Sequence, residues 1–196
     1  MIDGGWQTAA HVLREGGVVA SPTDTVWGLV TLASCAAGVD RIYAIKDRPA
    51  DLELPLLAAA VADIEALVDF GPAARELAAR FWPGALTMVV RCRDPRPAIV
   101  IPRRGDTLAV RVPAHRGLQA LLAETGPLAS TSANPHGRSP ANTAGEVRRL
   151  LGDRVDFVVH ATGPVGGVAS TIVDCTVEPC TVIRAGAVDP FAGQLR

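Results

Sequence analysis

The chain has 196 residues, 48% of them apolar, which is enough for one well-buried core. Its 19 basic and 20 acidic residues give a formal net charge of -1, which excludes a strong overall field toward nucleic acid or a membrane. A site for anions must therefore be local. The apolar run over 54–61 is too short to cross a bilayer, and no secretory leader pattern opens the chain. We expect a soluble, cytoplasmic protein without membrane contact.

Helix and strand patterns interleave along the first half of the chain. Apolar residues recur at helical spacing from Trp6 to Leu13, and a β-like run follows over Val18–Ala20. The next predicted elements are a helix over Ala36–Lys46, a buried strand over Leu54–Ala60, helices over Ala62–Val68 and Pro72–Phe81, and a strand over Leu86–Arg91. This alternation is typical of an α/β chain.

Strands become more frequent toward the end of the chain. The predicted elements there are a strand over Thr107–Val112, a helix over Leu118–Glu124, a polar loop over Ser132–Asn142, a helix over Ala144–Leu151, and strands over Asp156–Val159, Thr171–Val173 and Thr181–Ile183. Because several strands follow one another, we predict an α/β (mixed α+β) fold. Its helices flank a twisted sheet of parallel and antiparallel strands.

The cysteines and histidines show no pattern of metal ligands. The four cysteines, Cys35, Cys92, Cys175 and Cys180, contain no C-x-x-C pair, and none lies near a histidine at zinc-ligand spacing. Three of them lie in or beside apolar segments, where buried free thiols are common. We interpret them as small core residues that require neither a metal nor a disulfide, and we predict no protein metal site.

The chain contains none of the common glycine-rich phosphate motifs. Neither G-x-x-x-x-G-K-[ST] nor a strand followed by G-x-G-x-x-G occurs. The run Gly163–Gly167 is rich in glycine but has a different spacing. We interpret it as a flexible loop, and a loop that moves over a ligand stays open as an alternative.

Lys46 is the one lysine of the chain, beside eighteen arginines. It ends the predicted helix Ala36–Lys46 and lies two positions before Arg48. A lysine ammonium approaches a single oxygen or a small anion closely, whereas the planar fork of arginine suits bidentate phosphate contacts. The pair therefore offers both kinds of cation. Taken alone, Lys46 is equally well a solvated charge at a helix end, close to the last carbonyl groups.

Hydroxyl-rich turns follow the β-like runs and predict a polar cleft. These turns are Ser21–Thr25, Ser130–Asn134, Arg138–Pro140 and Ser170–Thr171. Each taken singly is more often a turn or a helix cap. Together with Arg48, Arg111 and Arg184 they describe a cleft that holds an anionic ligand. Arg111 and Arg184 fall within or at the end of β-like runs, so their charges must be exposed on one face or paired.

Six blocks of residues carry a resemblance to a known family. They are Pro22–Leu29, Lys46-x-Arg48-Pro49, Trp82–Thr87, Arg111–Pro113, Ser130–Asn134 and Ser170–Asp174. In this order the blocks resemble the signature of the YrdC/Sua family, the threonylcarbamoyl-adenylate synthases, from about Gly16 to Arg184. The resemblance implies one YrdC-like domain with a concave polar cleft, which we place at residues 1–190, followed by a short tail at 191–196.

The resemblance also implies a nucleotidyl transfer. L-Threonine reacts with bicarbonate to give a carbamate, which attacks the α-phosphorus of ATP and displaces pyrophosphate. The product, L-threonylcarbamoyl-AMP, serves the machinery that transfers the threonylcarbamoyl group to the tRNA adenosine beside the anticodon. Mg²⁺ is expected to enter with ATP, held largely by the nucleotide rather than by a carboxylate cage. Weak binding of tRNA by the chain itself stays open.

The family pattern implies roles for particular residues. Lys46 and Arg48 would be the catalytic cations at the carbamate or the α-phosphate. Threonine would contact Thr25, Arg111, Ser130 and Ser170, and ATP would contact Arg48, Thr107, Ser132, Asn134, Ser139 and Arg184. For Thr23 and Asp24 we prefer turn chemistry that shapes the floor of the pocket over direct catalysis.

The segment after Arg48 departs from the family pattern. Residues 50–54 make it two residues longer and more acidic than in many relatives, with Leu54 in place of an asparagine and Ala59 in place of a histidine. One alternative is therefore a YrdC-like paralogue with changed or lost activity. The other is a nucleotide- or RNA-binding module without turnover, which the net charge of -1 disfavours.

Overall fold

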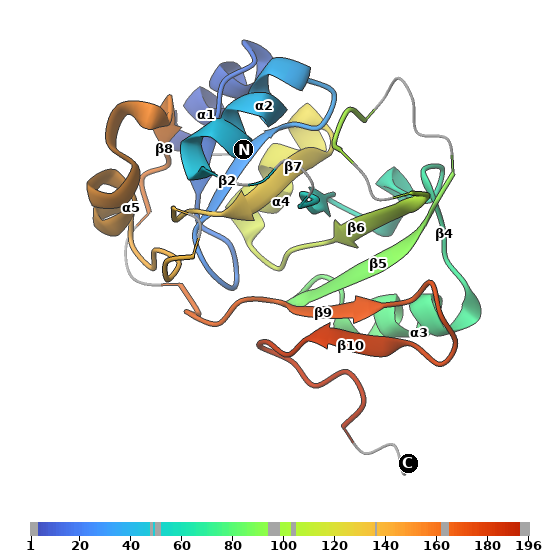
Figure 1. Ribbon diagram of the computed structural model, residues 1–196. Helices are drawn as coiled ribbons and strands as arrows, with labels where there is room; N and C mark the ends of the chain where they lie inside the picture. Colours follow the sequence, from blue (N-terminus) through green and yellow to red (C-terminus); the bar gives the residue numbers. More distant parts are fainter. Residues whose placement is uncertain are drawn as a thin grey trace.

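Ten strands form one sheet in the part of the chain that the structure describes, with helices packed on both of its faces (Figure 1). The structure is a computed structural model, and it describes residues 4–47, 49, 52–93, 99–102, 105–135, 137–161 and 165–192. The helices in these ranges are α1 (Gly4–Arg14), α2 (Ala36–Lys46), α3 (Pro72–Phe81), α4 (Arg116–Thr125) and α5 (Ala144–Leu151), with short 3-10 turns η1 (Val61–Asp63) and η2 (Gly152–Arg154).

The sheet mixes parallel and antiparallel strands. Its strands are β1 (Val19–Ser21), β2 (Gly28–Leu32), β3 (Leu56–Leu57), β4 (Val68–Asp69), β5 (Leu86–Cys92), β6 (Thr107–Arg111), β7 (Leu128–Ser132), β8 (Phe157–Val158), β9 (Thr171–Asp174) and β10 (Thr181–Arg184). Across the sheet the order is β10-β9-β5-β6-β3-β7-β2-β1-β8, and β4 pairs with β5. The pairs β1/β8, β3/β6 and β5/β9 are parallel. The predicted α/β fold with a mixed sheet is confirmed.

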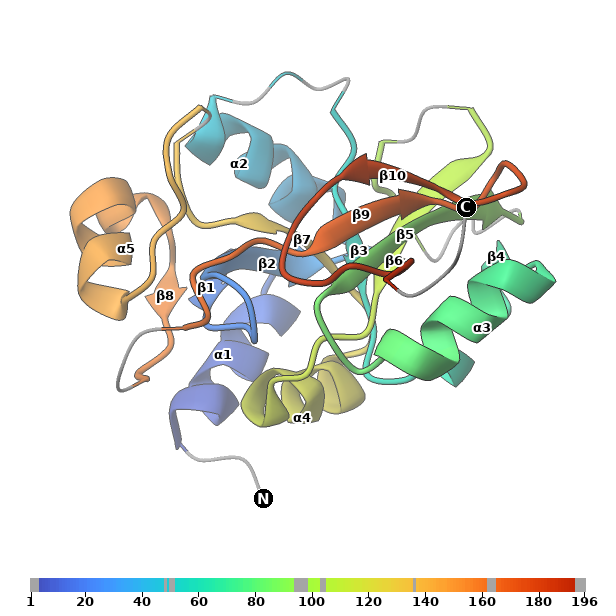
Figure 2. The ribbon, with the colours of Figure 1, turned by 90° about the horizontal axis from the view of Figure 1, so that it is seen from below.

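Neighbouring residues of one strand face different helix layers. Figure 2 shows α2 on one side of the sheet and α1, α3 and α4 on the other. Val30 of β2 is buried in a core cluster with Leu118 of α4. The adjacent Leu29 belongs to a second, larger cluster with Ile42 of α2. This alternation is what an extended strand requires, and it fixes which face of the sheet each side chain reaches.

β5 separates the α3 layer from a face on which polar side chains gather. Met88 and Val90 are fully buried in the cluster that contains Leu77 of α3. Thr87 and Val89 alternate with them along the strand, so they point to the opposite face of the sheet. Polar groups on that face are therefore positioned by a rigid, well-packed strand.

The predicted helices agree with the structure where their ends carry clear signals. α2, α3 and α5 have the predicted bounds, and α1 and α4 include the predicted ranges and extend beyond them. Pro72 occupies the first turn of α3, and the hydroxyl of Thr143 accepts a hydrogen bond from the Glu146 amide at the start of α5. α2 ends at Asp47, whose left-handed backbone (φ 49°) caps the helix directly after Lys46.

One predicted helix is wrong. The segment Ala62–Val68 contains only the 3-10 turn η1, after which Val68 pairs with Cys92 of β5. The Asp63 carboxylate accepts a hydrogen bond from the Ala60 amide at 2.8 Å and caps this single turn. Pairing with the sheet therefore overrides the local helical pattern.

Two strands also differ from the prediction. Within the segment predicted as a strand, Leu54–Ala60, only Leu56 and Leu57 pair, with β6 on one side and β7 on the other. β2 was not predicted, because it begins at Gly28, a residue type that is unfavourable in strands. It nevertheless pairs with β7 over five residues, from Gly28–Ser132 to Leu32–Leu128.

Candidate functional site

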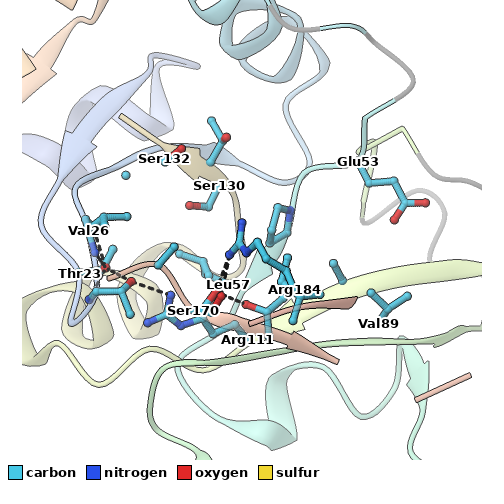
Figure 3. A pocket seen from close by; sticks show the side chains of 18 of the residues that line it. Thr23, Val26, Glu53, Leu57, Val89, Arg111, Ser130, Ser132, Ser170 and Arg184 are labelled. Atoms are coloured by element: carbon cyan, nitrogen blue, oxygen red, sulfur yellow. Dashed lines mark hydrogen bonds between the residues drawn. The ribbon is translucent and has the colours of Figure 1, made fainter. Parts of the chain in front are cut away.

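A cavity of about 540 Å³ lies on the face of β5 and β6 that points away from α3 (Figure 3). This volume is typical of sites for small molecules, roughly 300–1,000 Å³. The lining residues are Thr23, Thr25, Val26, Gly28, Leu52, Glu53, Pro55, Leu57, Thr87, Val89, Thr107, Ala109, Arg111, Ser130, Thr131, Ser132, Pro140, Ala169, Ser170, Ile172, Ile183 and Arg184. The structure thus contains the predicted polar cleft. Three of the four hydroxyl-rich turns contribute hydroxyl-bearing residues to its lining, and the fourth contributes Pro140.

Arg111, the last residue of β6, is fixed against the cavity wall. Its guanidinium donates hydrogen bonds to Asp24 Oδ1 at 2.6 Å, to Thr25 Oγ1 at 3.0 Å and to the carbonyl oxygen of Gly84 at 2.9 Å. Burial lowers the pKa of Arg111 from its ordinary value, and the charge of the Asp24 carboxylate offsets part of this effect. An arginine stays protonated regardless. The expectation that a charge inside this strand must be exposed or paired is confirmed, since Arg111 is paired.

The turn from Thr23 to Val26 is held by the Thr23 hydroxyl. Its oxygen accepts from the amides of Thr25 at 3.0 Å and Val26 at 3.2 Å, and the hydroxyl donates to the Val26 carbonyl oxygen at 2.7 Å. Thr25 Oγ1 lies 2.9 Å from Thr23 Oγ1. Thr23 therefore has the turn-forming role that the sequence predicts, while the neighbouring Asp24 carboxylate also orients Arg111.

Part of the predicted glycine-rich loop packs closely on this turn. The Gly167 amide donates to the Thr25 carbonyl oxygen at 2.7 Å. A Cβ atom on Gly166 would lie 2.9 Å from the Asp24 carbonyl oxygen, so only glycine fits there without a shift. Gly163 and Pro164 of the same run lie outside the described residues. The described part of the loop thus buttresses the floor of the cavity.

A second arginine reaches the same end of the cavity from β10. The Arg184 guanidinium donates to the Ser170 carbonyl oxygen at 2.7 Å, and the Ser170 hydroxyl lies 2.8 Å from that of Thr87. Burial lowers the pKa of Arg184, and the nearby positive charge of Arg111 lowers it further. Among the described residues, no carboxylate forms an ion pair with Arg184. This end therefore holds one positive charge more than the Asp24–Arg111 pair balances.

Hydroxyl groups and one carboxylate line the rest of the cavity. Ser130 and Ser132 reach it from β7, two positions apart and hence on one face of the strand. Thr107, at the start of β6, places its hydroxyl 3.4 Å from Glu53 Oε1. In Figure 3 Glu53 and Val89 lie on the side of the cavity away from Thr23. The cavity thus has a cationic, hydroxyl-rich end and a second end around Glu53.

Lys46 lies behind the cavity wall rather than on it. Its side chain is 1% exposed, and Nζ donates to the carbonyl oxygens of Ser132 at 2.6 Å and Asn134 at 2.5 Å and to Asn134 Oδ1 at 3.2 Å. The alternative of a solvated charge at a helix end is therefore wrong. Lys46 fastens the end of β7 and the following loop to α2.

The other predicted site residues comprise seven that line the cavity, two that do not, and Arg48. Thr25, Thr107, Arg111, Ser130, Ser132, Ser170 and Arg184 all line the one cavity. Asn134 and Ser139 do not line it: the Asn134 amide group donates to the carbonyl oxygens of Pro135 and Arg138, and Ser139 is exposed. Arg48 lies outside the described residues.

Sequence reasoning missed three polar groups at this site. Asp24 was assigned to the turn alone, yet it pairs with Arg111 across 87 positions of the chain. Thr87 ends the block Trp82–Thr87, and the alternation of β5 would have revealed it. Glu53 lies in the segment that departs from the family pattern, where no local signal places it in a cavity.

Neither a metal-ligand cluster nor a membrane-spanning helix is found among the described residues. They contain no cluster of three or more histidine, cysteine, aspartate or glutamate side chains placed to hold a metal. None of the described helices is long and apolar enough to cross a bilayer.

Comparisons with known proteins identify relatives of this chain. The family model Sua5/YciO/YrdC, described as telomere recombination, matches residues 11–186. The threonylcarbamoyl-AMP synthase of Bacillus subtilis (strain 168) is 38% identical over 185 residues, which are 92% of this chain and 53% of that protein. The threonylcarbamoyl-AMP synthase of Halorhodospira halophila (strain DSM 244 / SL1) is 44% identical over 161 residues, 81% of this chain and 83% of that protein.

A solved structure of a relative has the same fold as this chain. Sua5 of Pyrococcus abyssi, crystallised in complex with L-threonine, superposes with a TM-score of 0.85 at 36% identity, covering 92% of this chain and 54% of that one. The chain spans about half the length of the Bacillus and Pyrococcus relatives. The family model nevertheless matches residues 11–186, which are most of this chain. The sequence identity of 38% to the Bacillus relative is also higher than that of proteins which share only a fold. The chain therefore belongs to the Sua5/YciO/YrdC family.

Proposed function

We propose that this chain synthesises L-threonylcarbamoyl-AMP from L-threonine, bicarbonate and ATP, with release of pyrophosphate. The product would supply the machinery that transfers the threonylcarbamoyl group to the tRNA adenosine beside the anticodon. Two comparisons support the proposal: relatives named threonylcarbamoyl-AMP synthase at 38% and 44% identity, and a relative crystallised in complex with L-threonine.

The observation that carries most weight is the presence of two arginines at one end of one cavity. The reaction brings a carbamate and a triphosphate together, so it needs fixed cations that offset the repulsion of two anions. Arg111 is immobilised by its hydrogen bonds to Asp24, Thr25 and Gly84. Arg184 lies near enough to Arg111 for the positive charge of Arg111 to lower the pKa of Arg184. An anion bound between the two guanidinium groups relieves their repulsion.

Threonine would occupy the cationic, hydroxyl-rich end. Its carboxylate would pair with Arg111, and its hydroxyl and amine would contact Thr25, Ser130 and Ser170. The amine attacks bicarbonate, and the carbamate forms with loss of water. A carbamate oxygen then attacks the α-phosphorus of ATP. The bond from that phosphorus to the bridging oxygen breaks, and pyrophosphate leaves with the electron pair.

ATP would extend along the cavity from Arg184 and Ser132 toward Thr107. A preorganised array of donors stabilises the charge that develops at the α-phosphorus without a covalent protein intermediate. Lys46 supports this array as a positioning residue, because it holds the carbonyl groups on either side of the Ser132–Asn134 corner. The expected contacts of Lys46 and Arg48 with the reacting groups, and of Asn134 and Ser139 with ATP, stay predictions.

Mg²⁺ would enter with ATP. Glu53 is the one carboxylate among the described lining residues, and a single carboxylate does not make a protein cage for this ion. The metal would therefore be held mainly by phosphate oxygens, where it neutralises the triphosphate and favours departure of pyrophosphate.

Release of pyrophosphate from ATP tests the proposal. We expect release only when threonine, bicarbonate and ATP are all present. Omitting threonine or bicarbonate should reduce the rate to that of the buffer. Equal rates with and without threonine would contradict the proposal. Tight ATP or RNA binding without any release would instead support a binding module, and release with a different amino acid would support a paralogue of changed specificity.

A further inference from the structure

Two cysteines face each other at the turn of the C-terminal hairpin. β9 and β10 pair antiparallel, with Asp174 opposite Thr181. Continuing this register by one residue places Cys175 opposite Cys180, across the turn formed by residues 176–179. The sequence spacing C-x-x-x-x-C gives no signal of this pairing, because only the register of the two strands creates it.

The register of the strands implies the backbone spacing that a disulfide needs. The Cys175 amide donates to the carbonyl oxygen of Val89 on β5 at 2.8 Å, so its backbone polar groups point away from β10. Such an antiparallel pair is of the non-hydrogen-bonded kind, in which the Cα atoms are about 4.5 Å apart and the side chains are close. Disulfides bridge Cα atoms that are roughly 4.4–6.8 Å apart.

The surroundings of the two thiol groups agree with this placement. Both cysteines are free and half-buried. Burial raises the pKa of the Cys175 thiol, and the neighbouring Cys180 raises it further. An influence of Cys180 on Cys175 agrees with the register of the strands, which brings the two side chains to the same end of the hairpin.

The pair lies on the face of the hairpin away from the ligand cavity. Ile172 lines the cavity, so the alternation of β9 turns Val173 and Cys175 to the other face. Both cysteines accordingly pack at the edge of the larger core cluster. Figure 1 shows the hairpin at the edge of the sheet, and the two cysteines are only partly buried there.

We propose that Cys175 and Cys180 form a dithiol modification site that a low-molecular-weight disulfide oxidises to a cross-strand disulfide. One thiolate attacks the reagent, whose sulfur–sulfur bond breaks and releases one thiol. The second cysteine then displaces the other half of the reagent as a second thiol. In sum, the protein loses two hydrogens and gains one sulfur–sulfur bond, while the reagent is reduced to two thiols.

The disulfide would clamp the hairpin at the end opposite to the cavity contacts. At the open end of the hairpin, Arg184 already donates to the Ser170 carbonyl oxygen at 2.7 Å. The disulfide at one end and the Arg184–Ser170 hydrogen bond at the other would then fix the register of β9 against β10. The modification thus acts on the element that carries Arg184, without occupying the cavity.

Thiol–disulfide exchange with glutathione tests the site on the full, folded chain. The chain is equilibrated with oxidised and reduced glutathione, quenched with acid, and mapped by mass spectrometry. We expect two of the four thiols to disappear, with one internal link between Cys175 and Cys180. Because the hairpin holds the thiols together, the equilibrium constant should exceed that of the urea-unfolded chain by about 10-fold or more.

Two variants make the outcome specific. Cys35→Ser should leave the internal disulfide unchanged, whereas Cys175→Ser should abolish it and leave a glutathione adduct on Cys180. Adducts that persist on both cysteines of the unsubstituted chain would overturn the proposal. Links to Cys35 or Cys92, or equal equilibrium constants for the folded and unfolded chain, would overturn it as well.

Discussion

At the scale of single residues, the buried ion pair between Asp24 and Arg111 is the contact of the site whose loss should cost most stability. Their side chains are 16% and 8% exposed, so the pair is nearly removed from water. Removing one partner leaves a buried charge uncompensated. We predict that Asp24→Asn lowers the free energy of unfolding by ~3–5 kcal/mol, measured by urea denaturation. The Michaelis constant for threonine should rise as Arg111 loses its orientation.

An exposed ion pair of the same chemistry provides the control. Arg91 and Asp106 approach to 2.9 Å, but their side chains are 59% and 66% exposed. Water screens such a pair, so Asp106→Asn should cost only ~0–1 kcal/mol. Equal losses for Asp24→Asn and Asp106→Asn would contradict the importance of burial at the site.

Lys46 supports a second prediction about single residues. Its ammonium is buried against the carbonyl oxygens of Ser132 and Asn134. An arginine keeps the charge but does not fit this compact arrangement. We predict that Lys46→Arg lowers kcat/KM by at least about 10-fold and the free energy of unfolding by ~1–3 kcal/mol, since buried acceptors lose their donor. Loss of activity at unchanged stability would instead indicate direct contact with the reacting groups.

At the scale of elements, α4 depends on the protonation state of His115. The Nδ1 atom of His115 accepts a hydrogen bond from the Leu118 amide at 3.2 Å and caps the helix. This cap requires an unprotonated Nδ1. Burial lowers the pKa of His115 from 6.5, against a smaller opposing effect of the Asp24 charge. The folded chain therefore binds this proton less readily than the unfolded chain.

The sign of the resulting pH dependence follows from linkage. A lowered pKa in the folded state contributes stability above pH 6.5, and this stability is lost as the pH falls through 6.5 and below. We predict that His115→Asn, which keeps an acceptor at the cap, reduces the loss of unfolding free energy between about pH 8 and about pH 5. The exposed His11→Asn serves as the matched control. Identical pH profiles for His115→Asn and the unsubstituted chain would rule out this role.

Elements with strong local signals were predictable from the sequence, and those defined by pairing were not. α2, α3 and α5 have the predicted bounds because caps and apolar periodicity mark their ends. β4 and β2 were missed because their residues become strands only through Cys92 of β5 and residues 128–132 of β7. The thiol pair of the hairpin was missed for the same reason.

At the scale of the whole molecule, the sequence predicts which residues line the cavity better than it predicts the contacts between them. Seven of the predicted site residues line one cavity. The pattern of blocks contains this information because five of the six blocks begin or end a strand, while the block Lys46–Pro49 follows α2. The partner of Arg111, the burial of Lys46 and the place of Glu53 depend on contacts between distant segments, which no local pattern encodes.

The identity of the reaction product tests the proposed activity most directly. The chain is incubated with ATP, Mg²⁺, L-threonine and bicarbonate that carries a carbon isotope label. The nucleotides are then separated by chromatography and identified by mass spectrometry. The proposal predicts labelled L-threonylcarbamoyl-AMP in an amount equal to the pyrophosphate released. Pyrophosphate without labelled product, or labelled product without dependence on threonine, would contradict it.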